Sequence, residues 1–461
     1  MSVANPTIHL SSWLTRPVSI APLVVFRILF GLLMLVNILR FMAKGWVKQL
    51  YIDPQFYFKY YGFEWVHPLG GNGMYIVFVL MGLSALFLLL GWYYKVSSTC
   101  FFLLFTYVEL LDQTNYLNHY YFVSIISFLL IWVPAHRYFS LDVWRKPGLL
   151  RNEVPFWTVN IFKLQMGILY FFAGVAKLNP DWLLRAMPLK IWLPAKADFP
   201  LIGPVLSSQW APYLFCWTGA VYDLSIAFLL LLRKVRPYAY TAVVLFHLAT
   251  GLLFQIGMFP YIMIGITLIF FPASFHQQII DFLEKALKKI LGNRFIQIKS
   301  KQSTVLKLHP KIQRLAIVFL IAHFSLQLFL PMRYALYPNK LFWTEQGFRF
   351  SWRVMLMEKA GYATFHVQEV ETGKTWMVSN SDYLTPYQEK MMATQPDMIL
   401  QYAHFLEDEY KKKGLESLKV TVECYVTLNG KPSTLLIDPE KDLTKLNESF
   451  KHKSWILPFE E

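Results

Sequence analysis

Runs of about 20 nearly uncharged residues recur along this chain, each long enough to cross a bilayer as a helix. Lipid offers no partners to backbone N–H and C=O groups, and a helix satisfies these groups internally. The chain is 55% hydrophobic and 17% aromatic, which is too apolar for a soluble protein of this length. These features predict a polytopic α-helical membrane protein. About nine membrane helices are expected, over 18–42, 73–94, 96–112, 119–135, 156–177, 211–232, 237–255, 258–273 and 313–332.

Lysine and arginine are concentrated in alternate loops, around 137–151, 233–236 and 285–314. By the positive-inside rule these loops are cytoplasmic. The N-terminus is then cytoplasmic, and an odd number of spans puts the C-terminus outside. The net charge of +15 is read as loop charge facing anionic lipid. No basic run interleaved with aromatics lies in a soluble segment, so nucleic acid is not an expected partner.

The last cytoplasmic loop has apolar residues at helical spacing, opposite its lysines. This pattern is typical of an amphipathic helix that anchors to the membrane surface without chemistry. Its apolar positions are Ile279, Ile280, Leu283, Leu287, Ile290 and Leu291.

The character of the chain changes near residue 336. Residues 363–370 and 375–378 flank a turn at 371–374, and strands over 418–428 and 433–438 meet at Asn429-Gly430, a strong hairpin signal. A helix is expected over 396–412. We therefore predict two domains, a helical membrane domain over 1–335 and a small mixed α/β extracytoplasmic domain over 336–461.

Lys177 ends the predicted helix 156–177 among small and apolar neighbours, and Pro180 follows shortly after. An ammonium that loses its hydration is easier to deprotonate, so Lys177 is a candidate general base. The alternative is a lysine that snorkels from the helix end to the headgroups. On this segment alone snorkelling is favoured.

Other polar residues fall in or beside the apolar runs, where they are costly and often functional. The predicted orientation brings Asn118, His119, Lys177 and the loop after His247 to the extracytoplasmic face. For Asp223, tying helices together is at least as well supported as a site role, and an isolated interior His247 is more often structural. The remaining polar positions are Glu109, Asp112, Lys163, Gln165, Tyr170, Tyr222 and Gln255.

Several chemistries lack their motifs in this sequence. There is no HExxH, CxxC, P-loop or GxSxG, and no GxGxxG followed by an acidic residue. The eleven histidines have no paired spacing, so no metal site is predicted. Three cysteines are too few for a disulfide framework. Acidic residues do not line several helices, which argues against a simple cation transporter.

Short motifs in a fixed order over more than 400 residues resemble the vitamin K-dependent γ-glutamyl carboxylase family, in its bacterial form, and the wider group of horizontally transferred transmembrane proteins. The motifs include Arg16-Pro17, Leu111-Asp112-Gln113-Thr114, Asn118-His119, Ala173-Gly174-Val175, Lys177-Leu178, Asp223-Leu224-Ser225, Phe246-His247, Gln255-Ile256-Gly257-Met258-Phe259, Ser351-Trp352, Pro396-Asp397-Met398 and Asp438-Pro439.

The resemblance implies an enzyme that uses vitamin K hydroquinone, O2 and CO2, with no metal, to carboxylate glutamate in a peptide or protein. The resemblance reverses the preference at Lys177 from snorkelling to catalysis, because Lys177 matches the family's base that deprotonates the hydroquinone. Catalytic His119 is implied beside it. Residues that match the cofactor site are Asn118, Tyr170, His247 and Met258, and residues that match the glutamate site are Trp352 and Met355. The expected location is the membrane, here the bacterial inner membrane, with the site on the extracytoplasmic side.

The chain departs from the family pattern in three places. Arg353 and Val354 stand where an acidic residue and a methionine are expected, which predicts altered glutamate recognition. No cysteine lies near Glu64 for the disulfide of the animal enzyme, and the chain stops soon after Asp438-Pro439, without the long animal C-terminal extension that is associated with substrate docking. Two alternatives stay open: a quinol-oxidising membrane enzyme without carboxylation, and a non-catalytic membrane transporter or binding protein.

Overall fold

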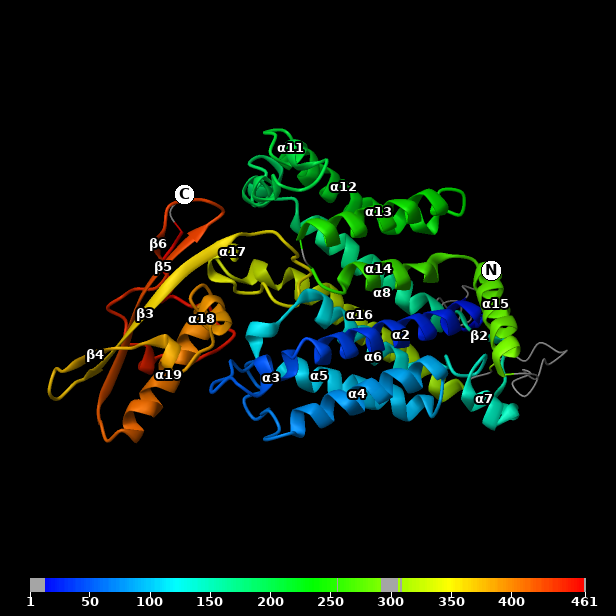
Figure 1. Ribbon diagram of the computed structural model, residues 1–461, viewed down its shortest axis with the longest axis horizontal. Helices are drawn as coiled ribbons and strands as arrows, with labels where there is room; N and C mark the ends of the chain where they lie inside the picture. The colour runs from blue at the N-terminus through cyan, green and yellow to red at the C-terminus, as the bar shows by residue number, and fades with distance from the viewer. Residues whose placement is uncertain (1–12, 255, 292–305, 307–308, 460–461) are drawn as a thin grey trace, which may run out of the picture.

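The computed structural model describes residues 13–254, 256–291, 306 and 309–459. The molecule is elongated, with a bundle of long helices on one side and a small sheet-containing domain at the opposite end (Figure 1). Gln255, one of the polar residues singled out above, lies outside the described residues.

The bundle contains most of the predicted membrane helices, with different lengths. Its members are α2 (Ala21–Ala43), α4 (Gly73–Leu90), α5 (Tyr94–Leu110), α6 (Asn118–Trp132), α8 (Phe156–Ala176), α12 (Ala211–Leu231), α13 (Arg236–Phe254), α14 (Phe259–Thr267) and α16 (Pro310–Met332). Short helices α3 (Trp46–Tyr51), α7 (Leu141–Arg145), α9 (Pro180–Leu183), α10 (Leu189–Trp192) and α11 (Gly203–Leu206) connect them.

Six described helices are long and apolar enough to cross a membrane, or seven if the bent pair α14 and α15 (Ala273–Leu291) counts as one span. The prediction of about nine spans is therefore not confirmed. The predicted spans 96–112 and 119–135 correspond to α5 and α6, which have 17 and 15 residues. At 1.5 Å per residue these helices are about 25 Å and about 22 Å long, shorter than a hydrocarbon core of about 30 Å. The predicted span 258–273 ends where the chain bends by 116° into α15.

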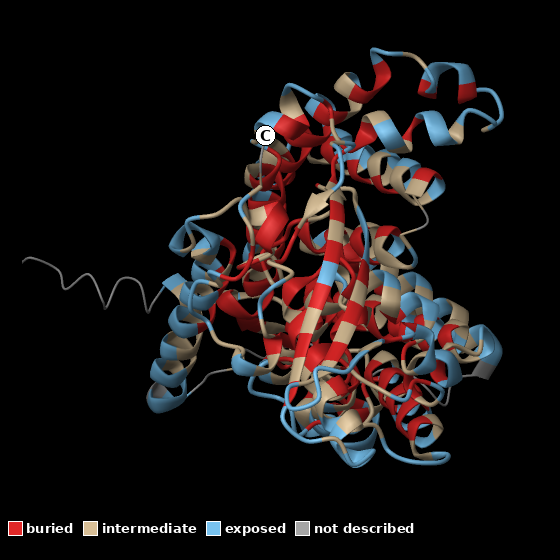
Figure 2. Cartoon of the chain, turned by 90° about the vertical axis from the view of Figure 1, so that its left-hand side faces the viewer, coloured by how far each residue is buried: buried red, intermediate tan, exposed pale blue. Residues whose placement is uncertain are grey.

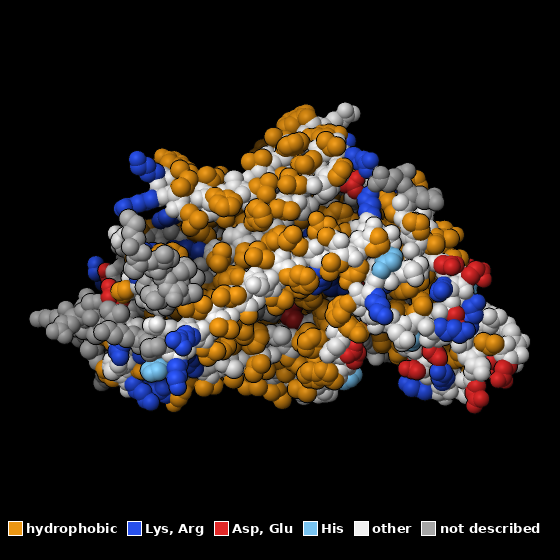
Figure 3. Space-filling model, turned by 180° about the vertical axis from the view of Figure 1, so that it is seen from behind, with side chains coloured by type: hydrophobic (Ala, Val, Ile, Leu, Met, Phe, Trp, Pro, Cys, Tyr) orange, Lys and Arg blue, Asp and Glu red, His pale blue; other side chains and the backbone are white. Residues whose placement is uncertain are grey.

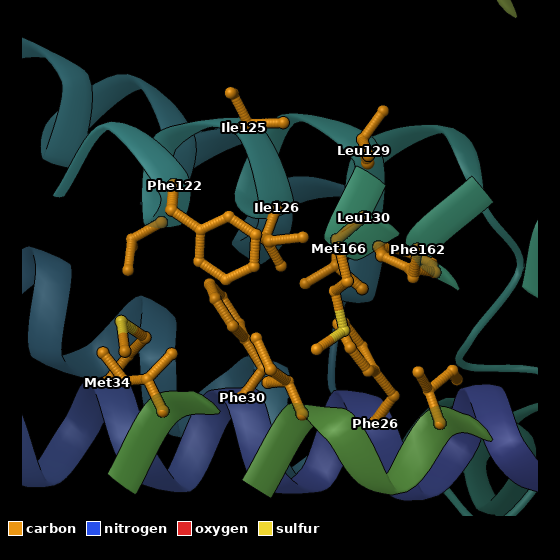
Figure 4. Close-up of a cluster of buried hydrophobic side chains, with 14 of the residues drawn as sticks. Phe26, Phe30, Met34, Phe122, Ile125, Ile126, Leu129, Leu130, Phe162 and Met166 are labelled. Carbon is orange, nitrogen blue, oxygen red and sulfur yellow. The ribbon is translucent and has the colours of Figure 1, made fainter. Parts of the chain in front are cut away.

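Helix α2 forms the centre of the bundle. Phe26, Phe30 and Met34, spaced four residues apart, lie on one face of α2 and are almost completely buried. Figure 4 shows Phe30 directed toward Phe122 and Ile126 of α6, and Phe26 directed toward Phe162 and Met166 of α8. The ring centroids of Phe26 and Phe162 are 4.4 Å apart, so one face of α2 packs into the core that it shares with α6 and α8.

Helices α8 and α12 approach each other closely at Gly174. A Cβ atom on Gly174 would lie 2.8 Å from the backbone nitrogen of Leu224, so only glycine fits without moving one helix. This approach brings the end of α8, where Lys177 lies, against α12.

Helix α15 confirms the predicted amphipathic helix. It crosses the end of the bundle opposite the sheet domain (Figure 1) and buries Ile280, whereas Ile290 is exposed. Lys288 and Lys289 lie in its last turn. In Figure 3, hydrophobic side chains gather over the middle of the molecule, between an end rich in Lys and Arg and the C-terminal domain with its mixed charges. This distribution is the one expected of a bilayer-spanning protein.

The C-terminal domain confirms the predicted strands and helix. Strands β3 (Lys359–Glu369), β4 (Thr375–Met377), β5 (Leu418–Leu428) and β6 (Thr434–Leu435) form an antiparallel sheet in the order β4-β3-β5-β6. Asn429 and Gly430 both have positive φ, as their hairpin turn requires. The helices of this domain are α17 (Leu341–Thr344), α18 (Pro386–Met392) and α19 (Pro396–Lys412), and α19 packs on β5.

Figure 2 looks onto this end of the molecule, where strands with alternating buried residues lie within a rim of exposed loops. A second, two-stranded sheet, β1 (Pro17–Ser19) with β2 (Glu153–Pro155), lies in the membrane domain and was not predicted from the sequence.

Residues 345–358 connect α17 to β3 and run along the membrane domain; we call this segment the linker. It is tied to α19 by an ion pair between Arg349 and Asp397. Burial raises the pKa of the Asp397 carboxyl, but the Arg349 guanidinium outweighs burial, and the net effect lowers this pKa to about 2. The neighbouring Gln395 accepts a further hydrogen bond from Arg349. This pair fixes the start of the segment 349–355, which reaches the candidate site.

We predict that Asp397→Asn destabilises the protein by about 3 kcal/mol, because it leaves the Arg349 charge buried without its partner. The pKa of Asp397 is depressed on folding, so the contribution of the pair is fully present above pH about 4, where an unfolded carboxyl is ionised. It is lost as the pH falls toward 2. Thermal unfolding of detergent-solubilised protein between pH 7 and pH 3 measures this difference. Glu409→Gln, which breaks an exposed pair with Lys412, is the control and should change little; equal melting shifts in the two variants would contradict the prediction.

We also predict that Gly174→Ala lowers the melting temperature, because its Cβ forces α8 away from α12. Gly167→Ala is a matched control on the same helix, since a Cβ there meets no atom within 4 Å. The control should be neutral or slightly stabilising, because alanine is the better helix former. A Gly174→Ala protein as stable as the Gly167→Ala protein would show that the close approach is not needed.

Candidate active site

Two adjoining cavities lie where the membrane domain meets the linker to the C-terminal domain. The larger has a volume of about 720 Å³ and the smaller about 110 Å³. Four residues line both cavities and separate them: Ile256, Phe259, Val354 and Met355. We call these four residues the shared wall. It is built from the α13–α14 connection, the start of α14 and the linker, which are far apart in the sequence.

The smaller cavity contains a buried ion pair between Lys177 and Asp223. Lys177 is the C-cap of α8, and its Nζ lies 2.6 Å from Asp223 Oδ2 and donates a longer hydrogen bond, 3.3 Å, to the Ala173 carbonyl. Both side chains are only 8% exposed. A snorkelling lysine exposes its ammonium, so snorkelling does not describe Lys177.

The space around Lys177 is shaped by aromatic and small residues. The Trp182 ring lies next to the Lys177 ammonium, with the ring centroid 5.5 Å from Nζ. Gly219 on α12 faces the lysine, and a Cβ there would lie 3.8 Å from Lys177 Cε. The ammonium therefore lies between one aromatic ring and one carboxylate, at the edge of the smaller cavity.

Tyr170 and His247 also line the smaller cavity. The Tyr170 hydroxyl lies 3.2 Å from Nε2 of His247, which joins α8 to α13. The other ring nitrogen of His247, Nδ1, is buried and has no hydrogen-bond partner within the described residues. A buried ring nitrogen without a partner is uncommon and is explained most simply by a ligand.

The larger cavity is lined by Asn118, His119, Met258 and Met355. The Asn118 side-chain amide donates a hydrogen bond of 2.8 Å to the Arg353 carbonyl, and its oxygen accepts one from the Tyr116 hydroxyl. Asn118 thus fixes the linker to the start of α6, and one N–H of its amide is left for a ligand. The His119 ring packs 5.5 Å from the ring of Phe259 in the shared wall.

The linker adopts an unusual backbone next to the larger cavity. Glu345, Phe350, Trp352 and Met355 all have φ between 55° and 61°, in the left-handed region that non-glycine residues avoid. Each such residue costs about 1–3 kcal/mol, and such residues cluster at functional sites. Trp352 lines neither cavity. It is buried against Tyr121 of α6, with 4.9 Å between the two ring centroids. Trp352 therefore packs the linker against α6.

The other polar residues singled out from the sequence lie away from the cavities. Asp112 accepts hydrogen bonds from Thr114 and from Gln388 of the C-terminal domain, so it joins the two domains. Gln165 bonds to His323 and Gln327 of α16 and holds that helix to α8. Within the described ranges, no group of three or more His, Cys, Asp or Glu residues has the geometry of a metal site.

Among the cavity residues that were not predicted as site residues, three are charged: Asp223, Arg40 and Arg353. Asp223 appears in the sequence as an isolated carboxylate, and its partnership with Lys177 depends on the approach of α8 to α12. Arg40 at the end of α2 lines the larger cavity, and its position beside the aromatic Trp46 resembles an ordinary interface arginine.

Two family comparisons cover most of the chain. The HTTM domain family matches residues 15–275. This range contains the long helices that line the two cavities. The lumenal domain of vitamin K-dependent gamma-carboxylase matches residues 312–461, which contain the linker and the sheet. No solved structure matches the chain. With these two domains in this order, the chain belongs to the vitamin K-dependent γ-glutamyl carboxylase family.

Proposed function

We propose that this protein carboxylates the γ-carbon of glutamate in a peptide or protein and couples this reaction to oxidation of vitamin K hydroquinone to its epoxide by O2. The observation that supports the proposal most directly is the buried Lys177–Asp223 pair. This pair lines a cavity that shares a wall with the cavity of Asn118 and His119, directly beneath a lumenal-type domain.

The residues of the smaller cavity fit the head group of a quinol, which is flat and apolar and has an oxygen at each end. Phe215, Phe246 and Phe254 supply apolar walls. Lys177 and the unpartnered Nδ1 of His247 supply polar atoms for the oxygens. Small-molecule sites combine mostly apolar walls with a few polar groups in this way.

Asp223 sets the protonation of the proposed base. In the ion pair Lys177 has no lone pair and cannot accept a proton. Transfer of one proton across the 2.6 Å contact leaves a neutral amine beside a neutral carboxylic acid. The amine then accepts a proton from a hydroquinone hydroxyl, and the carboxylic acid holds the first proton close by. Asp223 is thus proposed as a positioning residue that also stores a proton.

The quinol supplies the reducing power: with O2 it yields the epoxide and water, and the strong oxygen base formed on the way removes a γ-proton from glutamate. The glutamate carbanion then bonds to CO2, so the sum is hydroquinone, O2, glutamate and CO2 giving epoxide, water, γ-carboxyglutamate and one proton. Water would quench the carbanion. The shared wall of Ile256, Phe259, Val354 and Met355 is entirely apolar and would exclude water between the two cavities.

The proposed orientation follows the charge distribution. The basic helix α15 and the C-terminal sheet lie at opposite ends of the molecule (Figure 1). Placing α15 at the cytoplasmic surface puts the C-terminal domain and both cavities toward the extracytoplasmic side. Both cavities are lined in part by the linker to the C-terminal domain, which favours an enzyme that receives a peptide over a transporter.

A second candidate is quinol oxidation without carboxylation. It rests on a departure from the family resemblance: Arg353 lines the larger cavity where the resemblance implies an acidic residue, so a glutamate contact of the family's kind is absent there. This candidate would be supported if the protein formed epoxide without fixing CO2, and if a glutamyl peptide did not stimulate epoxide formation.

Lys177→Ala is expected to reduce hydroquinone oxidation by about 10²- to 10⁴-fold, the usual contribution of a general base. Quinone binding, followed by quenching of tryptophan fluorescence, should persist because the aromatic walls remain. Lys163→Ala, on the same helix but outside both cavities, is the matched control and should retain full turnover. A folded Lys177→Ala protein with normal turnover would contradict the proposed base.

Asp223→Asn is expected to reduce turnover by about 10- to 100-fold, because Lys177 loses the acceptor that takes its proton. The loss should appear in kcat more than in KM for the hydroquinone, since Asp223 acts through the lysine. Steady-state kinetics in detergent or nanodiscs measure both constants. If the variant changes only KM, Asp223 serves binding and not proton storage.

A further inference from the structure

The larger cavity has an unusual charge composition. Two arginines, Arg40 and Arg353, line it, and none of the described residues that line it is Asp or Glu. Arg40 is half-buried at the end of α2, with its guanidinium 4.9 Å from the Trp46 ring centroid. The cavity is therefore electropositive, which favours an anionic ligand.

Arg353 is buried without a carboxylate partner. The residue is only 8% exposed, and its Nε is buried with no hydrogen-bond partner among the described residues. Its guanidinium lies 4.3 Å from the ring centroid of Tyr334, with the Phe342 ring at 6.0 Å. Aromatic faces stabilise the cation, but the Nε–H group is left without an acceptor among the described residues.

The other buried arginine of the same segment is arranged differently. Arg349 is paired with Asp397 and also bonded to Gln395, so its charge is neutralised within the protein. No ion pair of Arg353 occurs in the part of the chain that the structure describes. A guanidinium buried at such cost is expected where a ligand brings the missing negative charge.

The backbone holds Arg353 in a fixed position beside the proposed chemistry. Asn118 bonds to its carbonyl, and Trp352 and Met355 on either side adopt left-handed conformations. The next two residues, Val354 and Met355, belong to the shared wall. A ligand bound by Arg353 would therefore lie next to the wall that separates it from the cavity of Lys177.

We propose that Arg353, assisted by Arg40, binds the side-chain carboxylate of the acidic peptide substrate and thereby selects glutamate over uncharged residues. This inference rests on the proposed function. A guanidinium binds a carboxylate through two parallel hydrogen bonds, which fixes the direction of the side chain as well as its charge.

Carboxylates and phosphates both suit an arginine, so an anionic lipid headgroup is the competing ligand. The position of Arg353 favours the peptide. It lies on the linker to the C-terminal domain and beside the wall of the catalytic cavity, whereas a headgroup would be expected at a surface rich in exposed lysine and arginine, such as the end that carries α15 (Figure 3).

The test compares two short peptides, identical except for a central Glu or Gln, binding to the full-length protein in neutral-lipid nanodiscs. Wild type should prefer the Glu peptide. Arg353→Gln should weaken Glu-peptide binding by about 10- to 100-fold, the loss expected for a hydrogen-bonded charge pair, and should abolish the preference. Arg185→Gln, which removes an arginine paired with Asp181 outside both cavities, should bind both peptides as wild type does.

Arg353→Met serves if Arg353→Gln does not fold, because it removes the buried polar atoms altogether. Equal binding of the two peptides by wild type, or an unchanged preference in Arg353→Gln or Arg353→Met, would overturn the inference. The inference would also be overturned if anionic phosphatidylglycerol in the nanodiscs abolished the preference of wild type for the Glu peptide, because the site would then bind lipid. Binding is measured without turnover, so an Arg353-dependent preference in a protein that does not oxidise hydroquinone would contradict the proposed function alone.

Discussion

The buried contact between Lys177 and Asp223 is the interaction on which the rest of the site depends. Two opposite charges in the interior of a helical bundle are stable together, and either alone is costly. The contact requires α8 and α12 to approach closely at Gly174, and the Trp182 ring packs beside the ammonium. The same contact makes the lysine an unusual base, because its proton can move to a neighbour 2.6 Å away and not into solvent. Stability and proposed reactivity thus come from one pair of atoms.

The C-terminal domain completes the site through the linker that contains Arg353, Val354 and Met355. This linker forms part of both cavities, although it follows the last long helix of the chain. The Arg349–Asp397 pair fixes its start and Asn118 fixes its end. Removal of the domain would therefore open the cavities, not merely release a substrate-binding module. The strained backbone of the linker is maintained only because both domains hold it.

Much of this architecture could be predicted from the sequence, since it depends on local pattern. The hairpin at Asn429-Gly430 and the helix beginning at Pro396 follow from turn chemistry and periodicity, and both are confirmed. The number of spans was less predictable. Helix α6 is apolar but has only 15 residues, and α5 contains Lys95 and Glu109 near its ends. The two helices are separated by the loop around Asp112, which binds the C-terminal domain.

The site was predictable only in part, for a physical reason. Lys177, His119 and Tyr170 were singled out as polar residues in or beside apolar runs, and the family resemblance supplied their roles, which stay proposals. The structure places the three residues around the two cavities. The pairing of Lys177 with Asp223 depends on which faces of two helices meet, which no local pattern specifies. In the sequence, Arg353 was recognisable only as a departure from the family resemblance. Its proposed role depends on the lack of a carboxylate partner among the described residues, which only the structure shows.

The most direct test of the account is the stoichiometry of the two products. Purified protein in nanodiscs would receive vitamin K hydroquinone, O2, labelled CO2 and a glutamyl peptide, and epoxide and fixed CO2 would be counted together, with and without Lys177. The account predicts one fixed CO2 per epoxide at saturating peptide, and loss of both products in the lysine variant. Folded wild-type protein that binds quinone but forms no epoxide, or a lysine variant that forms both products normally, would contradict it.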